Sequence, residues 1–224
     1  MFKESLGFTK FPIHLYENKN DEIKKSVLDY LEYWKENFYT ETWKNLTTVR
    51  GENAFQPKAF KQNFGKYRRI DEEDEYFEPI FNEVLKKIIL PNLQDYFDKN
   101  FDGPFEDEFI KYCEFKMWVV ELGPQAYQVA HLHTTQLTNS WYLLTEPDAG
   151  STIYWVDHLN RNLANCYRSK SNSYLNFGCN VEDGQSAMFP GDLIHHIDMN
   201  KSNGRRISVN TDFSMSIGIG EIYE

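Results

Sequence analysis

The pattern of hydrophobic and polar positions changes character near residue 105. Before that point, apolar residues recur at helical spacing in two stretches, residues 20–39 and 74–97. Asn20 or Asp21 is placed to cap the first helix, and Pro91 is expected to kink or restart the second. After residue 105, short apolar or alternating runs are separated by turn residues, which is typical of a sandwich or a barrel. We therefore expect an α+β chain whose helices precede a β-rich half.

The positions that carry this pattern are as follows. The apolar faces of the two expected helices consist of Ile23, Val27, Leu31, Trp34 and Phe38, and of Phe77, Phe81, Val84, Leu85 and Ile88. The expected strands are FKMWVVEL, YQVAHLH, SWYLL, STIYWV, SAMF, LIHHIDM and RISVNTDFSMSIGI. No internal repeat or linker divides the chain, so we expect one domain, 1–224. Its helical part, 1–104, packs outside the β-structure, and 105–224 carries the chemistry.

Composition and charge narrow the class of protein. With 41% hydrophobic and 16% aromatic residues the chain folds around a sizeable core, and its net charge of −10 disfavours nucleic acids and anionic membranes as partners. No apolar run is long enough to span a membrane, and the first twenty residues lack the apolar core of a signal peptide. The cysteines, Cys113, Cys166 and Cys179, are odd in number and widely spaced, as expected of reduced thiols. These features favour a cytoplasmic location.

The stretch AHLHTTQLTNSWYLL places His131 and His133 two residues apart in a predicted strand. Side chains two apart on a strand point to the same face, so the two imidazoles converge. FPGDLIHHIDM supplies His195 and His196, of which only one can face a shared site because neighbours on a strand alternate. Imidazole suits Fe(II), Zn(II), Cu(II) and Ni(II) alike, so the ligand type leaves the metal open.

A polar strand face follows the second histidine motif. In NGRRISVNTDF, a turn at Asn203–Gly204 opens a strand on which Arg206, Ser208 and Asn210 share one face. A guanidinium with a hydroxyl two residues on suits a carboxylate ligand, although an ordinary solvated face has the same pattern. A hairpin-like return of the chain would bring this face close to the metal.

In order and spacing these motifs resemble the Fe(II)/2-oxoglutarate-dependent oxygenases, and more narrowly a bacterial and phage subgroup of 2-oxoglutarate oxygenases. The matching stretches are MWVVELGPQAYQVAHLH, LTNSWYLL, FPGDLIHHI and RRISVN, which cover about residues 117–212 and leave the N-terminal half uncovered. The resemblance implies a double-stranded β-helix, a jelly-roll barrel with the metal near its open end. It also implies Fe(II) as the metal, 2-oxoglutarate as cosubstrate and O2 as oxidant.

The resemblance further implies a role for each candidate residue. His131 is the proximal ligand, His195 rather than His196 is the distal ligand, and Arg206 with Ser208 holds the distal carboxylate of 2-oxoglutarate. Tyr142 and Asn210 are candidate cosubstrate contacts, although a core role suits Tyr142 equally. The reaction implied is oxidation of a substrate C–H bond while 2-oxoglutarate is decarboxylated to succinate.

The sequence departs from the superfamily at His133, where most members carry Asp or Glu. A histidine there either completes a three-histidine site or lies outside the metal shell, with a carboxylate supplied from elsewhere. Asp157 is a remote candidate for that carboxylate.

Two other functions compete with the oxygenase. One is a cupin-like dioxygenase or zinc hydrolase that uses the three histidines without 2-oxoglutarate. The other is a jelly-roll binding module without enzymatic activity. The segment 158–184 is long, polar and rich in turn residues, and such loops cover a barrel mouth and select the substrate. The sequence is compatible with a small-molecule or a protein side-chain substrate and does not set the oligomeric state.

Overall fold

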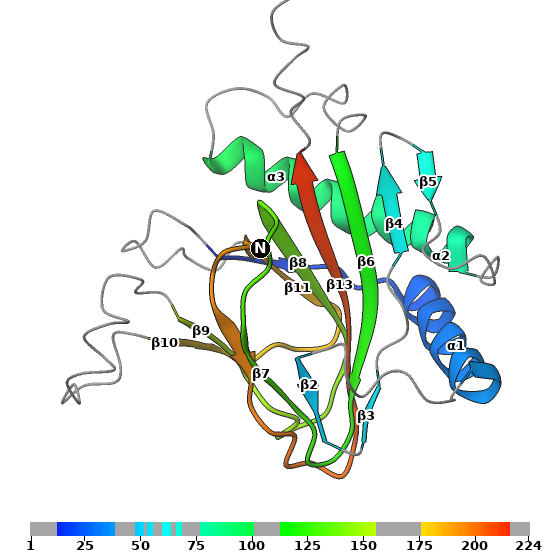
Figure 1. Ribbon diagram of the computed structural model, residues 1–224, viewed down its shortest axis with the longest axis vertical. Helices are drawn as coiled ribbons and strands as arrows, with labels where there is room; N and C mark the ends of the chain where they lie inside the picture. Colours follow the sequence, from blue (N-terminus) through cyan, green and yellow to red (C-terminus); the bar gives the residue numbers. More distant parts are fainter. Residues whose placement is uncertain are drawn as a thin grey trace, which may run out of the picture.

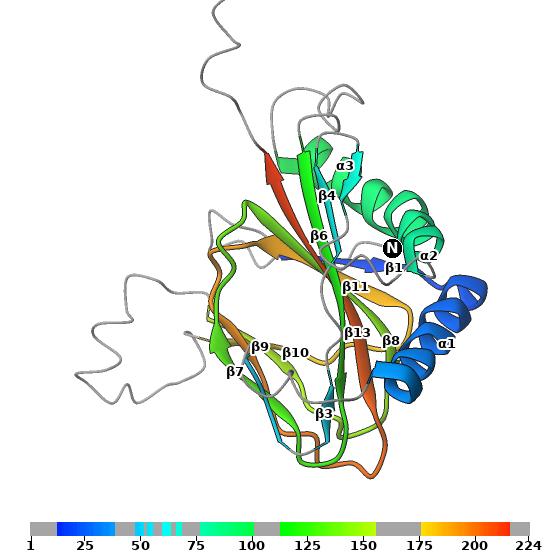
Figure 2. The ribbon, with the colours of Figure 1, turned by 45° about the vertical axis from the view of Figure 1, so that its right-hand side comes forward.

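Two facing β-sheets form the body of the protein, and helices cover the outside of one of them (Figures 1 and 2). The computed structural model describes residues 13–38, 48–51, 53–55, 60–63, 66–68, 77–100, 113–155 and 176–215. The larger sheet has eight strands in the order β1-β11-β8-β13-β6-β4-β5, with β3 also paired to β6. The smaller sheet has five strands in the order β10-β9-β12-β7-β2. This confirms the α+β class and the jelly-roll, double-stranded β-helix expected above.

The bounds of the elements are these. The strands are β1 His14–Glu17, β2 Val49–Arg50, β3 Ala54–Phe55, β4 Phe60–Asn63, β5 Lys66–Arg68, β6 Cys113–Leu122, β7 Tyr127–His131, β8 Leu137–Thr145, β9 Thr152–Trp155, β10 Asn176–Cys179, β11 Gln185–Pro190, β12 His195–Ile197 and β13 Arg206–Met215. The helices are α1 Asp21–Phe38, α2 Phe77–Val84 and α3 Leu90–Asn100, with a π-helical turn at Leu85–Ile89 between the last two.

The long central strands β6, β8 and β13 are buried on both faces. On the outer face, residues such as Val119, Trp141 and Val209 pack against the helices in the main core cluster. On the inner face, residues such as Trp118 and Tyr142 pack toward the smaller sheet. Strand side chains alternate, so the helix cover makes one face of the larger sheet apolar while the other face is left for the barrel interior.

The helices begin and bend where the sequence predicts. The Asn20 side chain accepts a hydrogen bond from the Ile23 backbone N–H (3.1 Å), which identifies Asn20 as the N-cap of α1. The second helix restarts around Pro91, because proline has no N–H to donate and its ring crowds the preceding turn. The chain accommodates this with the π-helical turn, in which the Leu90 N–H donates to the Leu85 carbonyl.

The part of the chain before residue 105 also contributes strands, which the sequence pattern did not reveal. Strand β1 pairs with β11 at the edge of the larger sheet, and β2 pairs with β7 in the smaller sheet. These strands are short, and their pairing depends on distant partners, so no alternating run announces them.

Three further features bear on the earlier expectations. Cys113 and Cys179 are buried, and Cys166 lies outside the described residues. No helix in the described ranges is both long and apolar enough to cross a membrane. Most of the expected substrate-selecting loop, residues 158–175 of the segment 158–184, also lies outside the described residues.

Candidate active site

Strand pairing places His131 and His195 side by side inside the barrel. Strands β7 and β12 are antiparallel neighbours, and His131 lies directly opposite His195 in their register. Their ring centroids are 4.2 Å apart. Directly opposed residues of an antiparallel pair project to the same face, so two histidines from distant parts of the sequence meet at one point.

His133 joins this pair from the segment that follows β7. Its ring is stacked on Trp118 (centroids 5.7 Å apart) and lies parallel to that of His195, with the two Nε2 atoms 3.4 Å apart. The backbone N–H of His133 donates a hydrogen bond to the Gly191 carbonyl (2.8 Å). A Cβ at Gly191 would lie 2.1 Å from the Thr135 carbonyl oxygen, so glycine is required for this close approach.

The three imidazoles are oriented for metal binding. Their candidate ligand atoms all lie within 4.8 Å of one another. In each ring the Nδ1 atom faces an acceptor: the Val129 carbonyl for His131 (2.8 Å), the Leu193 carbonyl for His195 (3.0 Å) and a carboxylate for His133 (2.7 Å). A proton on each Nδ1 leaves the Nε2 lone pair directed at the shared point.

Burial favours the neutral, ligating form of His131 and His195. Removal from water lowers the pKa of His131 to about 4 and that of His195 well below its usual value. Imidazole ligates metals through a neutral ring, so little proton competition is expected at neutral pH. Gln128 lies at the same point, with its side-chain nitrogen 3.3 Å from His131 Nε2.

The carboxylate that contacts His133 is Asp212, a residue that the sequence reasoning missed. Its Oδ1 lies 2.7 Å from His133 Nδ1, and the Thr138 hydroxyl donates to the same oxygen (2.9 Å). The signal was present in the sequence, because Asp212 continues the alternating face of Arg206, Ser208 and Asn210 on β13. The candidate considered from the sequence, Asp157, lies outside the described residues.

His196 points away from this cluster, as strand alternation predicts. Its Nδ1 accepts a hydrogen bond from the Trp155 indole N–H (2.9 Å), and its Nε2 lies 3.4 Å from a carboxylate oxygen of Asp198. Of the two adjacent histidines, His195 alone is therefore grouped with His131 and His133.

Arg206 is a buried cation inside the barrel, with only 1% of its surface exposed. Its Nη2 donates to the Thr152 hydroxyl (2.6 Å), and its guanidinium lies 5.0 Å from the centroid of the Tyr142 ring. Within the described residues, its Nε and Nη1 have no hydrogen-bond partner. Burial lowers the pKa of Arg206, which still leaves a cation at neutral pH.

The other predicted polar residues line one cavity together with the three histidines. The Ser140 hydroxyl donates to the Asn210 side-chain oxygen (2.8 Å), and the Asn210 amide donates to Ser208 (3.3 Å). The Tyr142 hydroxyl lies 3.2 Å from that of Thr152. The sequence analysis identified Ser208, Asn210 and Tyr142 but did not identify the two partners from other strands, Ser140 and Thr152.

These side chains enclose a narrow cavity. Its lining joins the three histidines to the polar face and to Trp118, and consists of Trp118, Gln128, His131, His133, Ser140, Tyr142, Thr152, His195, Ile197, Ser208 and Asn210. The cavity volume is about 10 Å³, about the size of a single water molecule. A dicarboxylate therefore enters only if lining side chains move, as is common on ligand binding.

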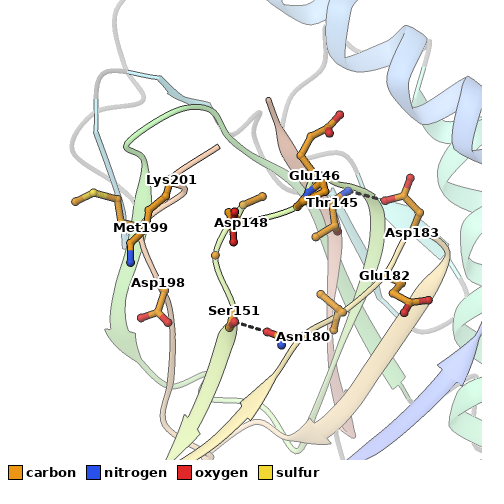
Figure 3. Close-up of a pocket in the computed structure, with 14 residues that line it drawn as sticks. Thr145, Glu146, Asp148, Ser151, Asn180, Glu182, Asp183, Asp198, Met199 and Lys201 are labelled. Atoms are coloured by element: carbon orange, nitrogen blue, oxygen red, sulfur yellow. Dashed lines mark hydrogen bonds between the residues drawn. The ribbon is translucent and has the colours of Figure 1, made fainter. Parts of the chain in front are cut away.

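A larger hollow of about 490 Å³ is lined by none of the ligand or cosubstrate residues predicted from the sequence, but part of its lining, residues 180–183, belongs to the segment 158–184 that was expected to select the substrate (Figure 3). It is formed by the β8–β9 turn, the segment before β11 and the segment after β12. Glu146, Asp148, Glu182, Asp183 and Asp198 surround it, with Lys201 as a cation. Asp183 already accepts a hydrogen bond from the Thr145 backbone and pairs with Lys24. Among the described residues, the histidine cluster and not this hollow has three candidate metal ligands that converge on one point.

Comparison with known proteins agrees with the geometry. Residues 116–212 match the model of the family described as "Putative 2OG-Fe(II) oxygenase". A solved oxidoreductase of the 2OG-Fe(II) oxygenase family from Burkholderia pseudomallei is 9% identical, with a TM-score of 0.54 over 90% of this chain and 84% of that one. HygX from Streptomyces hygroscopicus, solved with nickel and 2-oxoglutarate bound, is 10% identical, with a TM-score of 0.55 over 93% and 84% of the two chains. At these identities the structures establish the shared fold. No curated protein matches this chain.

Proposed function

We propose that this chain is a 2OG-Fe(II) oxygenase, because residues 116–212 match the model of that family, and that it is a hydroxylase that oxidises a C–H bond of its substrate. The family gives the cofactors as Fe(II), 2-oxoglutarate and O2. The hydroxylase reaction and the assignment of individual residues to the site are our proposal.

The donor set of the barrel interior fits the metal. His131, His133 and His195 would hold Fe(II) through their Nε2 atoms, since each Nδ1 faces an acceptor and the ligand atoms converge within 4.8 Å. Three protein ligands would leave coordination positions on such an ion for ligands other than the protein. When bound, iron and 2-oxoglutarate supply the oxidising chemistry, with succinate and CO2 as coproducts.

The observation that carries the proposal is the buried guanidinium of Arg206, which has a hydroxyl partner but no carboxylate partner among the described residues. A cation buried to 1% exposure without a carboxylate partner among the described residues is costly to the fold, and an anionic ligand offsets that cost. The free Nε and Nη1 donors suit a carboxylate, which guanidinium binds in a fork. A three-histidine zinc hydrolase has no use for such a group. Arg206 would hold the distal carboxylate of 2-oxoglutarate.

The remaining polar residues would orient the cosubstrate and exclude water. Ser208 and Thr152 offer hydroxyls beside Arg206, and Tyr142 supplies an aromatic wall with its own hydroxyl. Asn210 is held by Ser140 and in turn donates to Ser208, which fixes that hydroxyl. The substrate class we propose is a small molecule or a protein side chain, in keeping with a narrow interior and a net negative chain.

Anaerobic titration tests the proposal. Fe(II) and then 2-oxoglutarate are added to metal-stripped protein, and we expect a weak visible charge-transfer band that saturates with 2-oxoglutarate. His195→Ala should abolish the band, whereas His196→Ala, a neighbour that faces away, should retain it. Iron binding without a band would refute the use of 2-oxoglutarate, and absence of iron binding would refute the metal site.

A further inference from the structure

We propose that Asp212 is a positioning residue that supplies, through His133, the negative charge that the three-histidine site lacks. The inference rests on the proposed function, because it assumes that His133 ligates the metal. The usual metal shell of this superfamily contains a carboxylate, and the three imidazoles here contribute none. Asp212 would supply that negative charge indirectly, because its carboxylate contacts the His133 ring and not the metal itself.

The contact between the two residues is specific. Asp212 Oδ1 lies 2.7 Å from His133 Nδ1, and each side chain is 9% exposed, so the pair is shielded from solvent. The Thr138 hydroxyl donates to the same oxygen and fixes the carboxylate from the neighbouring strand (2.9 Å). A carboxylate that accepts from Nδ1–H sets the ring orientation, leaves Nε2 for the metal and makes it a stronger donor.

Among the described residues, no lysine or arginine side chain forms an ion pair with Asp212. Within the described residues, its only ion-pair contact is His133. Lys116 lies opposite Asp212 in the register of β6 and β13, but its ammonium group lies over the Trp118 ring, 5.4 Å from the centroid. A buried carboxylate without a permanent cation is costly to the apo-protein. A bound divalent cation next to its imidazole partner offsets that cost.

The strand geometry explains why the charge comes from β13. His133 lies beyond the end of β7, where its ring turns toward the larger sheet and stacks on Trp118 of β6. Asp212 projects into the barrel from the adjacent strand, on the face that carries Arg206. One face of β13 would thus serve the cosubstrate at one end and the metal ligand at the other.

The test compares metal affinity and the charge-transfer spectrum in variants of the full chain. Asp212→Asn keeps an oxygen that can accept from His133 but removes the charge, and Asp212→Ala removes both. We expect Fe(II) to bind about 10- to 100-fold more weakly in Asp212→Ala, with Asp212→Asn between this variant and the wild type. In Asp212→Asn, the band of the Fe(II)–2-oxoglutarate complex should move to shorter wavelength, because a less electron-rich iron donates less readily.

Matched controls separate this role from a structural one. Asp198→Asn makes the same charge change at the acidic hollow and should leave affinity and band position unchanged. Should Asp212→Asn fail to fold, Thr138→Val removes only the hydroxyl that holds the carboxylate and should shift affinity in the same direction by less. Unchanged affinity and band in a folded Asp212→Asn would overturn the inference.

A double-mutant cycle shows whether Asp212 acts through His133. In a His133→Gln background, Asp212→Asn should cause no further loss of Fe(II) affinity, because the imidazole through which Asp212 acts has already been removed. Fully additive losses would contradict the proposed route. Wild-type protein that binds no iron would instead refute the proposed function itself, so the two failures are distinguishable.

Discussion

Arg206 is a buried cation whose cost to stability would be explained by the cosubstrate-binding role proposed above. Its guanidinium is fully buried, and its described partners are one hydroxyl and one aromatic ring. A buried cation without an anion weakens the apo-protein relative to an apolar side chain of similar length. Such a group persists at a site where a ligand compensates for it.

Replacement of Arg206 by methionine should therefore separate stability from cosubstrate binding. We expect the apo-protein to be as stable as wild type or more stable by about 1–2 kcal/mol, since the desolvated charge is removed. The Kd for 2-oxoglutarate should rise at least tenfold while Fe(II) affinity is unchanged, so 2-oxoglutarate should raise the Tm less than in wild type. Thermal melts with and without 2-oxoglutarate provide the measurement. A variant that 2-oxoglutarate still stabilises as it does the wild type would show that Arg206 does not hold the cosubstrate.

At the residue scale, strand alternation made much of the candidate site predictable. It separated His195 from His196 and placed Arg206 on one polar face. His133 does lie beside His131, but strand alternation does not explain this, because β7 ends at His131 and His133 follows the strand. The polar face that carries Arg206 continues to Asp212. The sequence did not identify Asp212 as a site residue, because the sequence does not show which side chain a single aspartate on a strand will contact. Thr152 and Ser140 were missed for the same reason, since their contacts depend on how separate strands pair.

At the scale of elements, β1 is the clearest departure from the predicted pattern. The strand is four residues long, pairs with β11, and brings His14 under α3. The His14 ring packs on Tyr96 (centroids 4.8 Å apart), and the Asn100 side chain contacts its Nε2 (3.2 Å). Nothing local in the sequence marks this strand, because its stability comes from packing between distant segments. The helices, by contrast, were predictable from their periodicity and from Asn20 and Pro91.

Burial of His14 predicts an acid-sensitive contact between β1 and α3. Burial lowers the pKa of His14 and nearby Lys99 lowers it further, whereas Asp95 and the Asn100 contact oppose the shift. The folded state therefore binds fewer protons than the unfolded state below about pH 6.5. The stability that His14 contributes is fully present above that pH and is lost as the pH falls toward the folded pKa.

The measurement is chemical denaturation of the metal-free protein between pH 7.5 and pH 5. In His14→Gln, the free energy of unfolding should fall less steeply with acid than in wild type, by up to about 1.4 kcal/mol per pH unit. The comparison cancels the contribution of the other buried histidines, which both proteins share. Parallel pH profiles would show that His14 is not held neutral by the fold.

At the scale of the whole molecule, the helix-covered larger sheet and the smaller sheet have different relations to the site. The larger sheet is packed against α1, α2 and α3 through the main core cluster (Figure 2). The metal-ligand candidates belong to the smaller sheet and to the segment after β7. We therefore infer that the smaller sheet opens more readily in the absence of metal, since its outer face lacks a helix cover in the described residues.

Metal binding should stabilise the smaller sheet against local opening. At a free Fe(II) concentration 100 times the Kd, the folded state gains about 2.7 kcal/mol, so the Tm should rise with metal and return after chelation. Hydrogen exchange should slow most in residues 127–133 and 193–199, whereas the α1 amides are expected to exchange slowly even without metal, because α1 packs into the main core. His131→Ala should abolish both effects. Equal slowing in α1 and in the two ligand segments would mean that the barrel opens as one cooperative unit, and that the smaller sheet is not separately stabilised by the metal.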